Sequence, residues 1–224
     1  MSISSADPHA GAIIHTAGSP LGTAGAALIM VHGRGASAED ILDLARPLPE
    51  RGVAYLAPQA AGHTWYPHRF IEPIERNEPH LSSALAMITA IVGMVHDAGI
   101  PGERIALLGF SQGACLVSEW AVRNPARYGG VIALSGGLIG PWGTVWPDRG
   151  SLDGTPVFLG CSDVDSHIPA ERVVESATRF RELGGVVDLR LYPGLGHTIN
   201  RDELSAIRAI VDAMTGAGAS PSGP

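Results

Sequence analysis

The chain has 224 residues, of which 45% are hydrophobic and 17% are charged, a composition that favours a compact globule and argues against disorder. Its length suits one hydrophobic core. The formal net charge is −7, and the basic residues are arginines scattered along the chain without forming a stripe, which argues against nucleic acid as a partner. We predict a single domain over residues 9–214, between flexible ends at 1–8 and 215–224 that are rich in Ser, Gly, Ala and Pro.

Short apolar runs recur along the chain, and their length is typical of buried strands. Five segments between these runs carry apolar residues at three- and four-residue spacing, which predicts helices. The predicted strands are Ala26 to Val31, Val53 to Ala57, Arg104 to Gly109, Val131 to Leu134, Pro156 to Gly160 and Val186 to Tyr192; the predicted helices are Glu39 to Leu48, Leu81 to Ala98, Gly113 to Arg123, Ala170 to Leu183 and Arg201 to Met214.

This alternation of strands and helices predicts an α/β fold in which a mostly parallel central sheet carries helices on both faces. In such sheets, chemistry gathers beyond the carboxyl ends of the strands. One stretch, from Gln59 to Pro79, has no clear period and contains several prolines, histidines and aromatic residues. We expect it to run over the top of the sheet as a lid or a binding loop.

The strand that ends near Leu108 runs directly into the sequence Gly-Phe-Ser-Gln-Gly at residues 109–113 and then into a helix. A serine on this tight turn has its hydroxyl pushed into the open, because glycines two positions away allow neighbouring backbones to approach. Ser111 is therefore a candidate nucleophile. The helix that follows directs its unpaired amides at the same point, so the amide of Gln112 is a candidate donor to an oxyanion.

A second glycine-rich turn, His32-Gly33-Arg34-Gly35, follows the strand that ends at Val31. Its glycines permit a turn that points amides inward, which makes the backbone amide of Arg34 the candidate for the second oxyanion donor. His32 is expected to hold this turn and not to act in catalysis.

A serine nucleophile needs a base and an orienting acid, which in this arrangement follow it in the order acid, then histidine. Only His167 and His197 follow the serine. His197 lies in a glycine-rich loop between the last strand and the last helix, so we expect it to be the base. The loop after the strand that ends at Gly160 offers Asp163 and Asp165 as acids, and the pattern alone does not separate them.

With these residues in place, the chain resembles the small carboxylesterases related to acyl-protein thioesterases and lysophospholipases, a compact branch of the α/β-hydrolases. The resemblance covers about Ala26 to Met214. It is carried by His32-Gly33-Arg34-Gly35, Gly109-Phe110-Ser111-Gln112-Gly113, Leu134-Ser135-Gly136, Asp165-x-x-Ile168-Pro169 and Gly194-Leu195-Gly196-His197, all in the family's order.

The resemblance implies an α/β-hydrolase fold with Ser111 as nucleophile and His197 as base. The family's acid is the first residue of a D-x-x-[VI]-P stretch, which selects Asp165. The resemblance also implies an oxyanion hole built from the backbone amides of Arg34 and Gln112.

Trp65, Tyr66 and Phe70 fall where relatives place a substrate-lining loop, so we expect Trp65 and Tyr66 to form walls of the acyl pocket; the alternative is that these aromatics pack the loop onto the body of the protein. Arg34 stands where the family often has an apolar residue. Its side chain is expected either to point into solvent or to meet an acidic group of the substrate.

The function expected from these residues is that of a serine carboxylesterase acting on short- to medium-chain carboxylic esters. The alternatives are an acyl thioesterase or lysophospholipase with the same triad and, more remotely, a non-hydrolytic small-molecule receptor on the same fold. We expect no cofactor and no metal, because no ligand motif is present. The partner is expected to be a small ester or thioester, and the chain a monomer or homodimer.

The sequence also favours a cytoplasmic protein without stable membrane insertion. Cys115 and Cys161 are too few for a disulfide framework and lie beside apolar stretches, which is typical of thiols kept reduced. The apolar run Gly25 to Val31 is too short for a signal sequence or a membrane span.

Overall fold

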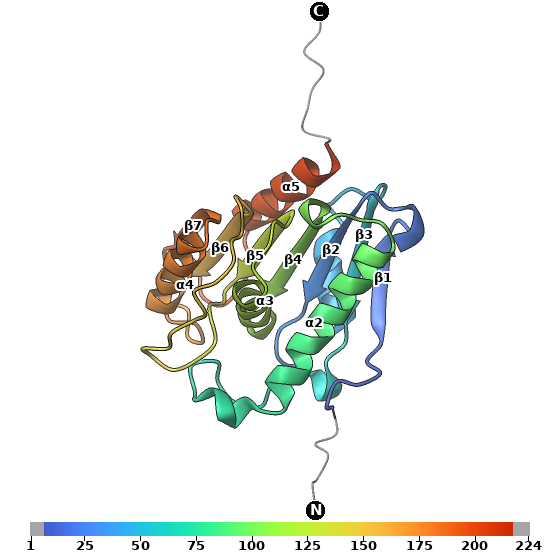
Figure 1. Cartoon of the computed structure of the whole chain (residues 1–224). Helices are drawn as coiled ribbons and strands as arrows, with labels where there is room; N and C mark the ends of the chain where they lie inside the picture. Colours follow the sequence, from blue (N-terminus) through green and yellow to red (C-terminus); the bar gives the residue numbers. More distant parts are fainter. Residues whose placement is uncertain (1–6, 217–224) are drawn as a thin grey trace, which may run out of the picture.

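The computed structural model describes residues 7–216, which fold around a seven-stranded sheet of order β1-β3-β2-β4-β5-β6-β7 (Figure 1). β1 pairs antiparallel with β3, and the other neighbouring strands pair parallel, as predicted. The strands are β1 (Ile14–Gly18), β2 (Ala26–Val31), β3 (Val53–Pro58), β4 (Ile105–Phe110), β5 (Gly130–Leu134), β6 (Pro156–Ser162) and β7 (Val186–Tyr192).

The five main helices cover both faces of the sheet (Figure 1). They are α1 (Ala38–Leu42), α2 (His80–Asp97), α3 (Gln112–Arg123), α4 (Ala170–Glu182) and α5 (Arg201–Thr215). The first is shorter than predicted: after Leu42 the chain tightens into a 3₁₀ turn, Asp43–Ala45. Pro47 follows closely and has no N–H to donate, so the helix cannot continue through it.

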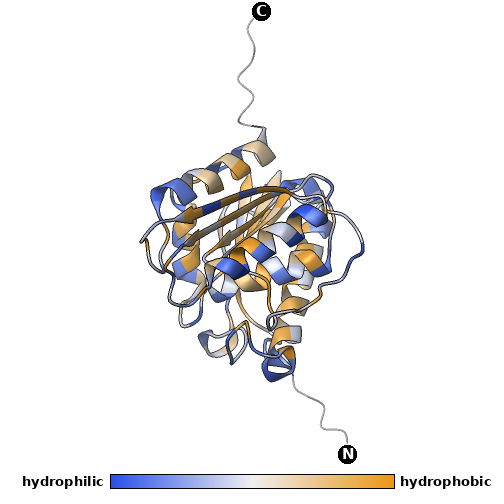
Figure 2. Ribbon diagram, turned by 90° about the vertical axis from the view of Figure 1, so that its left-hand side faces the viewer, coloured by the Kyte–Doolittle hydropathy of each residue, from blue (hydrophilic) through white to orange (hydrophobic). Residues whose placement is uncertain are grey.

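Side chains of the central strands alternate between two hydrophobic cores, one on either face of the sheet. On β2, Ile29 and Val31 pack with α2, α3 and α4, whereas Leu28 and Met30 pack with α1 and α5. Figure 2 shows the apolar strands lying between the helical layers. Burial on both faces explains why the central parallel strands β2 to β6 are mostly continuous apolar runs.

The sheet also contains a strand that the sequence did not predict. Residues Ile14–Gly18 form β1 at the sheet edge, where they alternate between half-buried and exposed positions. Their apolar signal is therefore weaker than that of the central strands, and pairing with β3 determines their conformation.

The predicted flexible ends fall mostly outside the described residues, which exclude 1–6 and 217–224. Asp7, within the predicted N-terminal end, accepts hydrogen bonds from the hydroxyl of Ser83 and the amide of His9. The chain is thus already packed against α2 at Asp7, and the N-terminal segment enters the fold at the edge where the parallel strands end (Figure 1).

Helix α2 is long and apolar enough, by length and composition, to cross a membrane. Its Leu81, Ile88 and Val95 are wholly buried in the core beside the sheet. This is the arrangement of a helix that packs on one side within a globular fold.

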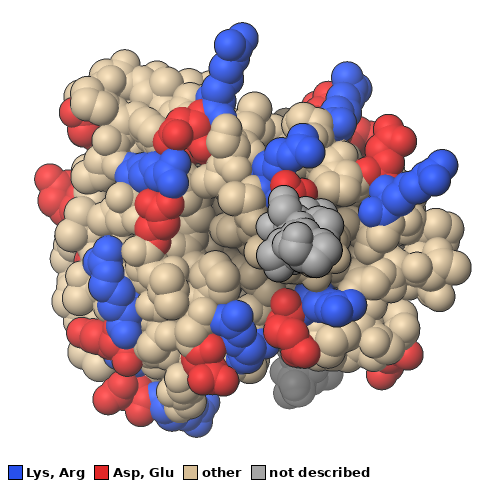
Figure 3. All heavy atoms as spheres, turned by 90° about the horizontal axis from the view of Figure 1, so that it is seen from above, with Lys and Arg blue, Asp and Glu red and all other residues tan. Residues whose placement is uncertain are grey.

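The surface carries charges of both signs. Figure 3, which views the end of the molecule away from the carboxyl ends of the parallel strands, shows arginines interspersed with aspartates and glutamates. This face therefore presents no continuous field of one sign.

Candidate active site

Ser111 lies on the turn between β4 and α3, at the carboxyl edge of the sheet. Its backbone has φ 55° and ψ −118°, a left-handed region that costs energy for any residue except glycine. The Ser111 amide donates to the carbonyl of Leu134 on β5 at 2.9 Å, and its carbonyl accepts from the Cys115 amide at 3.0 Å. The strained turn is thus held by the sheet on one side and by the helix on the other.

The flanking glycines are required by close backbone contacts. A Cβ on Gly113 would lie 2.1 Å from the carbonyl oxygen of Val31, and one on Gly109 would lie 2.3 Å from the backbone of Gly113. These are far below van der Waals contact. The structure therefore confirms the prediction that the two glycines let neighbouring backbones approach closely.

His197 and Asp165 converge on the serine. The Nε2 atom of His197 lies 2.9 Å from Ser111 Oγ, and its Nδ1 lies 2.7 Å from Asp165 Oδ2. A carboxylate cannot donate, so Nδ1–H donates to Asp165 and Nε2 faces the serine hydroxyl as acceptor. The imidazole packs between Phe110 and His167, with ring centroids 5.0 Å and 4.7 Å away.

The Asp165 side chain is wholly buried, with 0% of its surface exposed. Burial by itself raises the pKa of this carboxyl, but hydrogen bonds from His197 and from the amides of His167 and Ile168 outweigh it, so the net pKa is lowered. Those amides donate to Oδ1 at 2.8 Å and 3.1 Å. Asp165 is thereby kept ionised while it faces the imidazole.

Asp163, the other acid that the sequence left open, does not contact the imidazole. Its Oδ1 accepts from the Gly194 amide at 2.8 Å, and the hydroxyl of Ser162 accepts from the Gly196 amide at 3.0 Å. Both bonds tie the end of β6 to the loop that carries His197. Sequence reasoning missed this positioning role, because nothing in the pattern pairs these residues.

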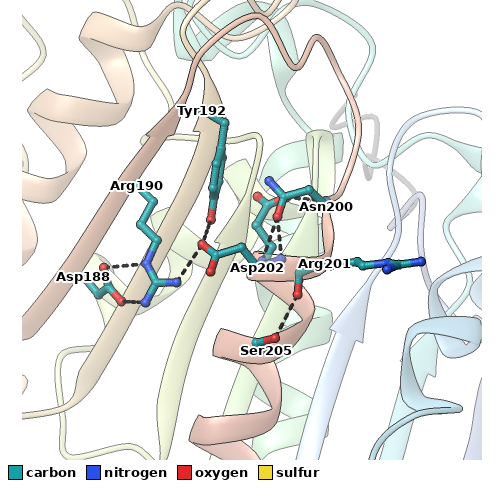
Figure 4. Close-up of polar contacts among 8 residues, drawn as sticks. Asp188, Arg190, Tyr192, Asn200, Arg201, Asp202 and Ser205 are labelled. Carbon is teal, nitrogen blue, oxygen red and sulfur yellow. Dashed lines mark hydrogen bonds and ion pairs between the residues drawn. The ribbon is translucent and has the colours of Figure 1, made fainter.

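A polar cluster fixes both ends of the same loop, where β7 leads into it and α5 leads out (Figure 4). Asp202 on α5 accepts from Arg190 at 2.8 Å and from the hydroxyl of Tyr192 at 2.7 Å. Arg190 also pairs with Asp188 at 2.6 Å. Asn200 caps α5 by accepting from the amide of Asp202 at 2.8 Å. The loop that presents His197 therefore spans two anchored elements.

A cleft of about 620 Å³ opens beside the triad, a size typical of small-molecule sites. Its walls come from the turn after β2, the loop after β3 and the loops that carry the triad. It is lined by Gly33, Arg34, Ala36, Tyr66, Pro67, His68, Arg69, Phe70, Glu72, Arg76, Phe110, Ser111, Gln112, Cys115, His167, Ile168 and His197.

The Arg34 side chain is exposed, as the first of the two expectations had it, but it also binds the protein. Its guanidinium donates to three consecutive carbonyls of the loop after β3, those of Tyr66, Pro67 and His68, at 2.8, 2.9 and 2.9 Å. The planar fork of arginine suits such multiple bonding, which lysine cannot reproduce. Arg34 is therefore an exposed side chain that also clamps the loop, a role that the sequence did not predict.

Gln112 holds the same loop from the other side. Its Oε1 accepts from the Trp65 amide at 2.9 Å, and its Nε2 donates to the Tyr66 carbonyl at 2.8 Å. The Tyr66 carbonyl therefore receives both Gln112 and Arg34. These two residues are also the predicted oxyanion donors, so the residues predicted to act through their backbones hold the wall of the cleft with their side chains.

Only one of the two predicted pocket aromatics lines the cleft. Tyr66 does so, although only 1% of its surface is exposed, whereas Trp65 is absent from the lining, is 0% exposed and donates from its indole to the His32 carbonyl at 2.8 Å. The prediction that Trp65 walls the pocket is therefore wrong in this structure. Phe70 takes a place among the lining aromatics that the sequence did not assign.

Two buried histidines, His9 and His32, bind the backbone of the loop after β3. His32 donates from Nδ1 to the Gly33 carbonyl at 2.7 Å and accepts at Nε2 from the Ala60 amide at 3.1 Å, so it holds the turn as predicted. His9, which the sequence did not single out, accepts at Nδ1 from the Ala61 amide at 3.2 Å and donates from Nε2 to the Trp65 carbonyl at 2.9 Å. Burial lowers the pKa of both.

The two predicted oxyanion amides lie on turns that meet at the serine. Gln112 is the first residue of α3, so its N–H has no partner within the helix. Gly33, next to Arg34, lies against the nucleophile: a Cβ there would be 3.3 Å from Ser111 Cβ. No protein acceptor is recorded for the Arg34 amide within residues 7–216.

Comparison with known proteins places this geometry in a family. Residues 14–215 match the model of the phospholipase/carboxylesterase family. The chain is 29% identical to acyl-protein thioesterase 1 of Eremothecium gossypii over 177 residues, which cover 75% of this chain and 72% of that protein. A probable carboxylesterase of Oryza sativa is 31% identical over 128 residues, covering 56% of this chain and 47% of that protein; several other matches span about half of each relative.

Solved structures agree with the fold. The crystal structure of a phospholipase/carboxylesterase from Dyadobacter fermentans matches with a TM-score of 0.84 and 41% identity, covering 88% of this chain and 95% of that one. Esterase PE8 matches with a TM-score of 0.72 and 22% identity over 91% and 99% of the two chains, which supports the fold alone. The fold is that of the α/β-hydrolases, and the chain belongs to the phospholipase/carboxylesterase family.

Proposed function

We propose that the protein is a serine carboxylesterase that hydrolyses short- to medium-chain esters through an acyl-enzyme on Ser111. One observation carries this proposal: His197 lies within hydrogen-bonding distance of both Ser111 Oγ, at 2.9 Å, and Asp165, at 2.7 Å. A hydroxyl, an imidazole and a buried carboxylate in this order can activate the oxygen for attack on an acyl carbon.

In acylation, His197 Nε2 takes the proton of Ser111 as Oγ attacks the carbonyl carbon. The imidazolium that forms is stabilised by Asp165, which holds the ring through Nδ1–H. The carbonyl double bond becomes a single bond to an oxyanion. When this tetrahedral species collapses, the bond to the leaving group breaks, and the proton on Nε2 goes to the departing alcohol or thiol.

The backbone amides of Arg34 and Gln112 serve as the oxyanion hole in this proposal. Gln112 N–H points out of the first turn of α3, where the helix dipole also favours negative charge. Such preorganised donors stabilise charge that exists only in the transition state. Water then attacks the acyl-enzyme with His197 as base, which releases the carboxylic acid and restores Ser111.

Tyr66 is the proposed substrate contact of the loop after β3, beside Phe70 in the same wall. The cleft of about 620 Å³ is large enough for the acyl part of a small ester. A thioesterase or lysophospholipase is the second candidate, because the match to an acyl-protein thioesterase covers 72% of that relative and the same triad serves thioesters.

A hydrolysis profile of the purified chain tests the proposal. Ester substrates of increasing acyl length, matched thioesters and lysophospholipids would be compared for the wild type and for Ser111→Ala. We expect turnover that peaks at short or medium esters and falls by at least about 10³-fold in Ser111→Ala. Turnover that survives in Ser111→Ala would refute the acyl-enzyme, and a wild type that binds but does not hydrolyse any of them would indicate a receptor.

A further inference from the structure

The net charge of the residues that line the cleft is opposite in sign to the net charge of the protein. The protein has a formal net charge of −7. The cleft is nevertheless lined by three arginines, Arg34, Arg69 and Arg76, against one acid, Glu72. Among the charged residues that line the cleft, arginines therefore outnumber acids, although the protein as a whole is acidic. The face in Figure 3, by contrast, mixes both signs.

Two of these arginines keep their charge uncompensated. Arg76 pairs with Glu72 at 2.7 Å, so those charges offset each other. Arg34 donates its three recorded bonds to neutral carbonyls. Arg69 is exposed, and no ion pair is recorded for it within residues 7–216.

The backbone that carries Arg69 is fixed. Asn77, wholly buried, accepts from the His68 amide at 2.8 Å and donates to the Arg69 carbonyl at 3.3 Å. The next residue, Phe70, is buried and its carbonyl accepts from the Gly140 amide at 2.8 Å. The loop therefore holds Arg69 at the cleft, between Tyr66 and Phe70 of the same wall.

We propose that the preferred substrates are esters or thioesters that carry an anionic group, a carboxylate or a phosphate, and that Arg69 binds this group at the cleft. Arg34 contributes a fixed positive charge beside it without giving up its bonds to the loop. Positive walls with low-dielectric surroundings concentrate anions and speed their association. This inference rests on the proposed function, since it names the substrate class of the same site.

Matched pairs of substrates test this inference. One arm compares the 4-nitrophenyl half-ester of glutaric acid with 4-nitrophenyl pentanoate, which places the carboxylate in the acyl part. The other compares a monoacylglycerol phosphate with the same monoacylglycerol, which places a phosphate in the leaving group. kcat/KM is measured for the wild type, Arg69→Gln and the control Arg181→Gln, an exposed arginine on α4 that is not part of the cleft.

We expect Arg69→Gln to lose about three- to tenfold in kcat/KM on the anionic member of at least one pair, with its neutral partner nearly unchanged. The loss should shrink at high salt, since exposed charges are screened. The substrate pair on which Arg69→Gln loses activity shows whether the anionic group belongs to the acyl part or to the leaving group. Arg181→Gln should behave as the wild type on both.

Equal effects of Arg69→Gln on charged and neutral esters, or no effect on either, would overturn the inference. Such a result would leave the proposed function intact, provided that Ser111→Ala abolishes hydrolysis of the neutral esters. A wild type that hydrolyses none of these four substrates would instead remove the proposed function, and this inference with it. Thermal melting of each variant confirms that the fold is retained.

Discussion

The nucleophile turn and the loop after β3 both line the cleft, but they are held in place by different means. Ser111 sits between a central strand and a helix, with backbone hydrogen bonds to β5 and α3 and glycine contacts on both sides. Residues 59–79 have only short 3₁₀ turns. They depend on side chains from elsewhere, above all Arg34, Gln112 and His32.

The two regions therefore have different tasks: the nucleophile turn presents the reacting groups, and the loop after β3 shapes the cleft that receives the substrate. The turn is built into the sheet, and the chemistry that it presents changes only when its own residues or their partners change. The loop is held by a few polar bonds from distant residues, so single substitutions far along the chain can alter the shape of the cleft. Strained or irregular segments of this kind persist only where the surroundings determine them.

The largest effect is expected where the triad acid is removed. Asp165→Asn should lower kcat by about 10³- to 10⁴-fold, because the amide cannot hold His197 in the required tautomer or stabilise its charge. Asp163→Asn is the matched control on the same loop. The amide oxygen of the new side chain can still accept from the Gly194 amide and only the charge is lost, so we expect less than about a tenfold loss in kcat.

Steady-state kinetics on one neutral ester decide this comparison. If Asp163→Asn lowered kcat more than Asp165→Asn, the acid would have been assigned to the wrong residue.

An intermediate effect is expected where the loop clamp is cut. Arg34→Met leaves the backbone amide in place but removes the bonds to the carbonyls of residues 66–68. We expect kcat/KM on neutral esters to fall by about ten- to a hundredfold, together with a changed preference for acyl length. Arg34→Lys should recover only part of the loss, because a single ammonium lacks the planar fork.

Arg46→Met is the control for this clamp, since Arg46 pairs on the surface with Asp43 and does not line the cleft. Unchanged acyl preference in Arg34→Met would mean that the loop keeps its shape without the clamp.

The smallest effect is a pH dependence of stability from His9 and His32. Burial lowers the pKa of both below the ordinary 6.5, so the unfolded chain takes up protons first as the pH falls. Their contribution to stability is therefore complete above about pH 6.5 and is lost progressively below it, by at most about 1.4 kcal/mol per pH unit for each histidine. Urea unfolding at pH 7.5 and pH 5.5 measures this loss.

His32→Gln should reduce the difference between the two pH values, while His96→Gln, at an exposed position on α2, should not. An undiminished difference in His32→Gln would show that other groups carry the dependence.

Local sequence determined the elements that carry the chemistry. Six strands and five helices follow from apolar spacing, because each buries one or both faces in a fixed period. Ser111 was predicted as the nucleophile from the glycines that the tight turn requires, and His197 as the base from its loop between the last strand and the last helix. For these residues the sequence pattern that predicts them is local, because the backbone geometry of each turn depends on the few residues beside it.

Tertiary structure alone decided how the cleft is walled. No local pattern shows that Trp65 turns inward while Tyr66 lines the cleft, that Arg34 reaches a loop more than thirty residues away, or that His9 accepts from Ala61. The edge strand β1 likewise forms only because β3 offers it a partner. Hydrogen bonds between distant residues depend on how the whole chain packs, so they leave no periodic trace in the sequence.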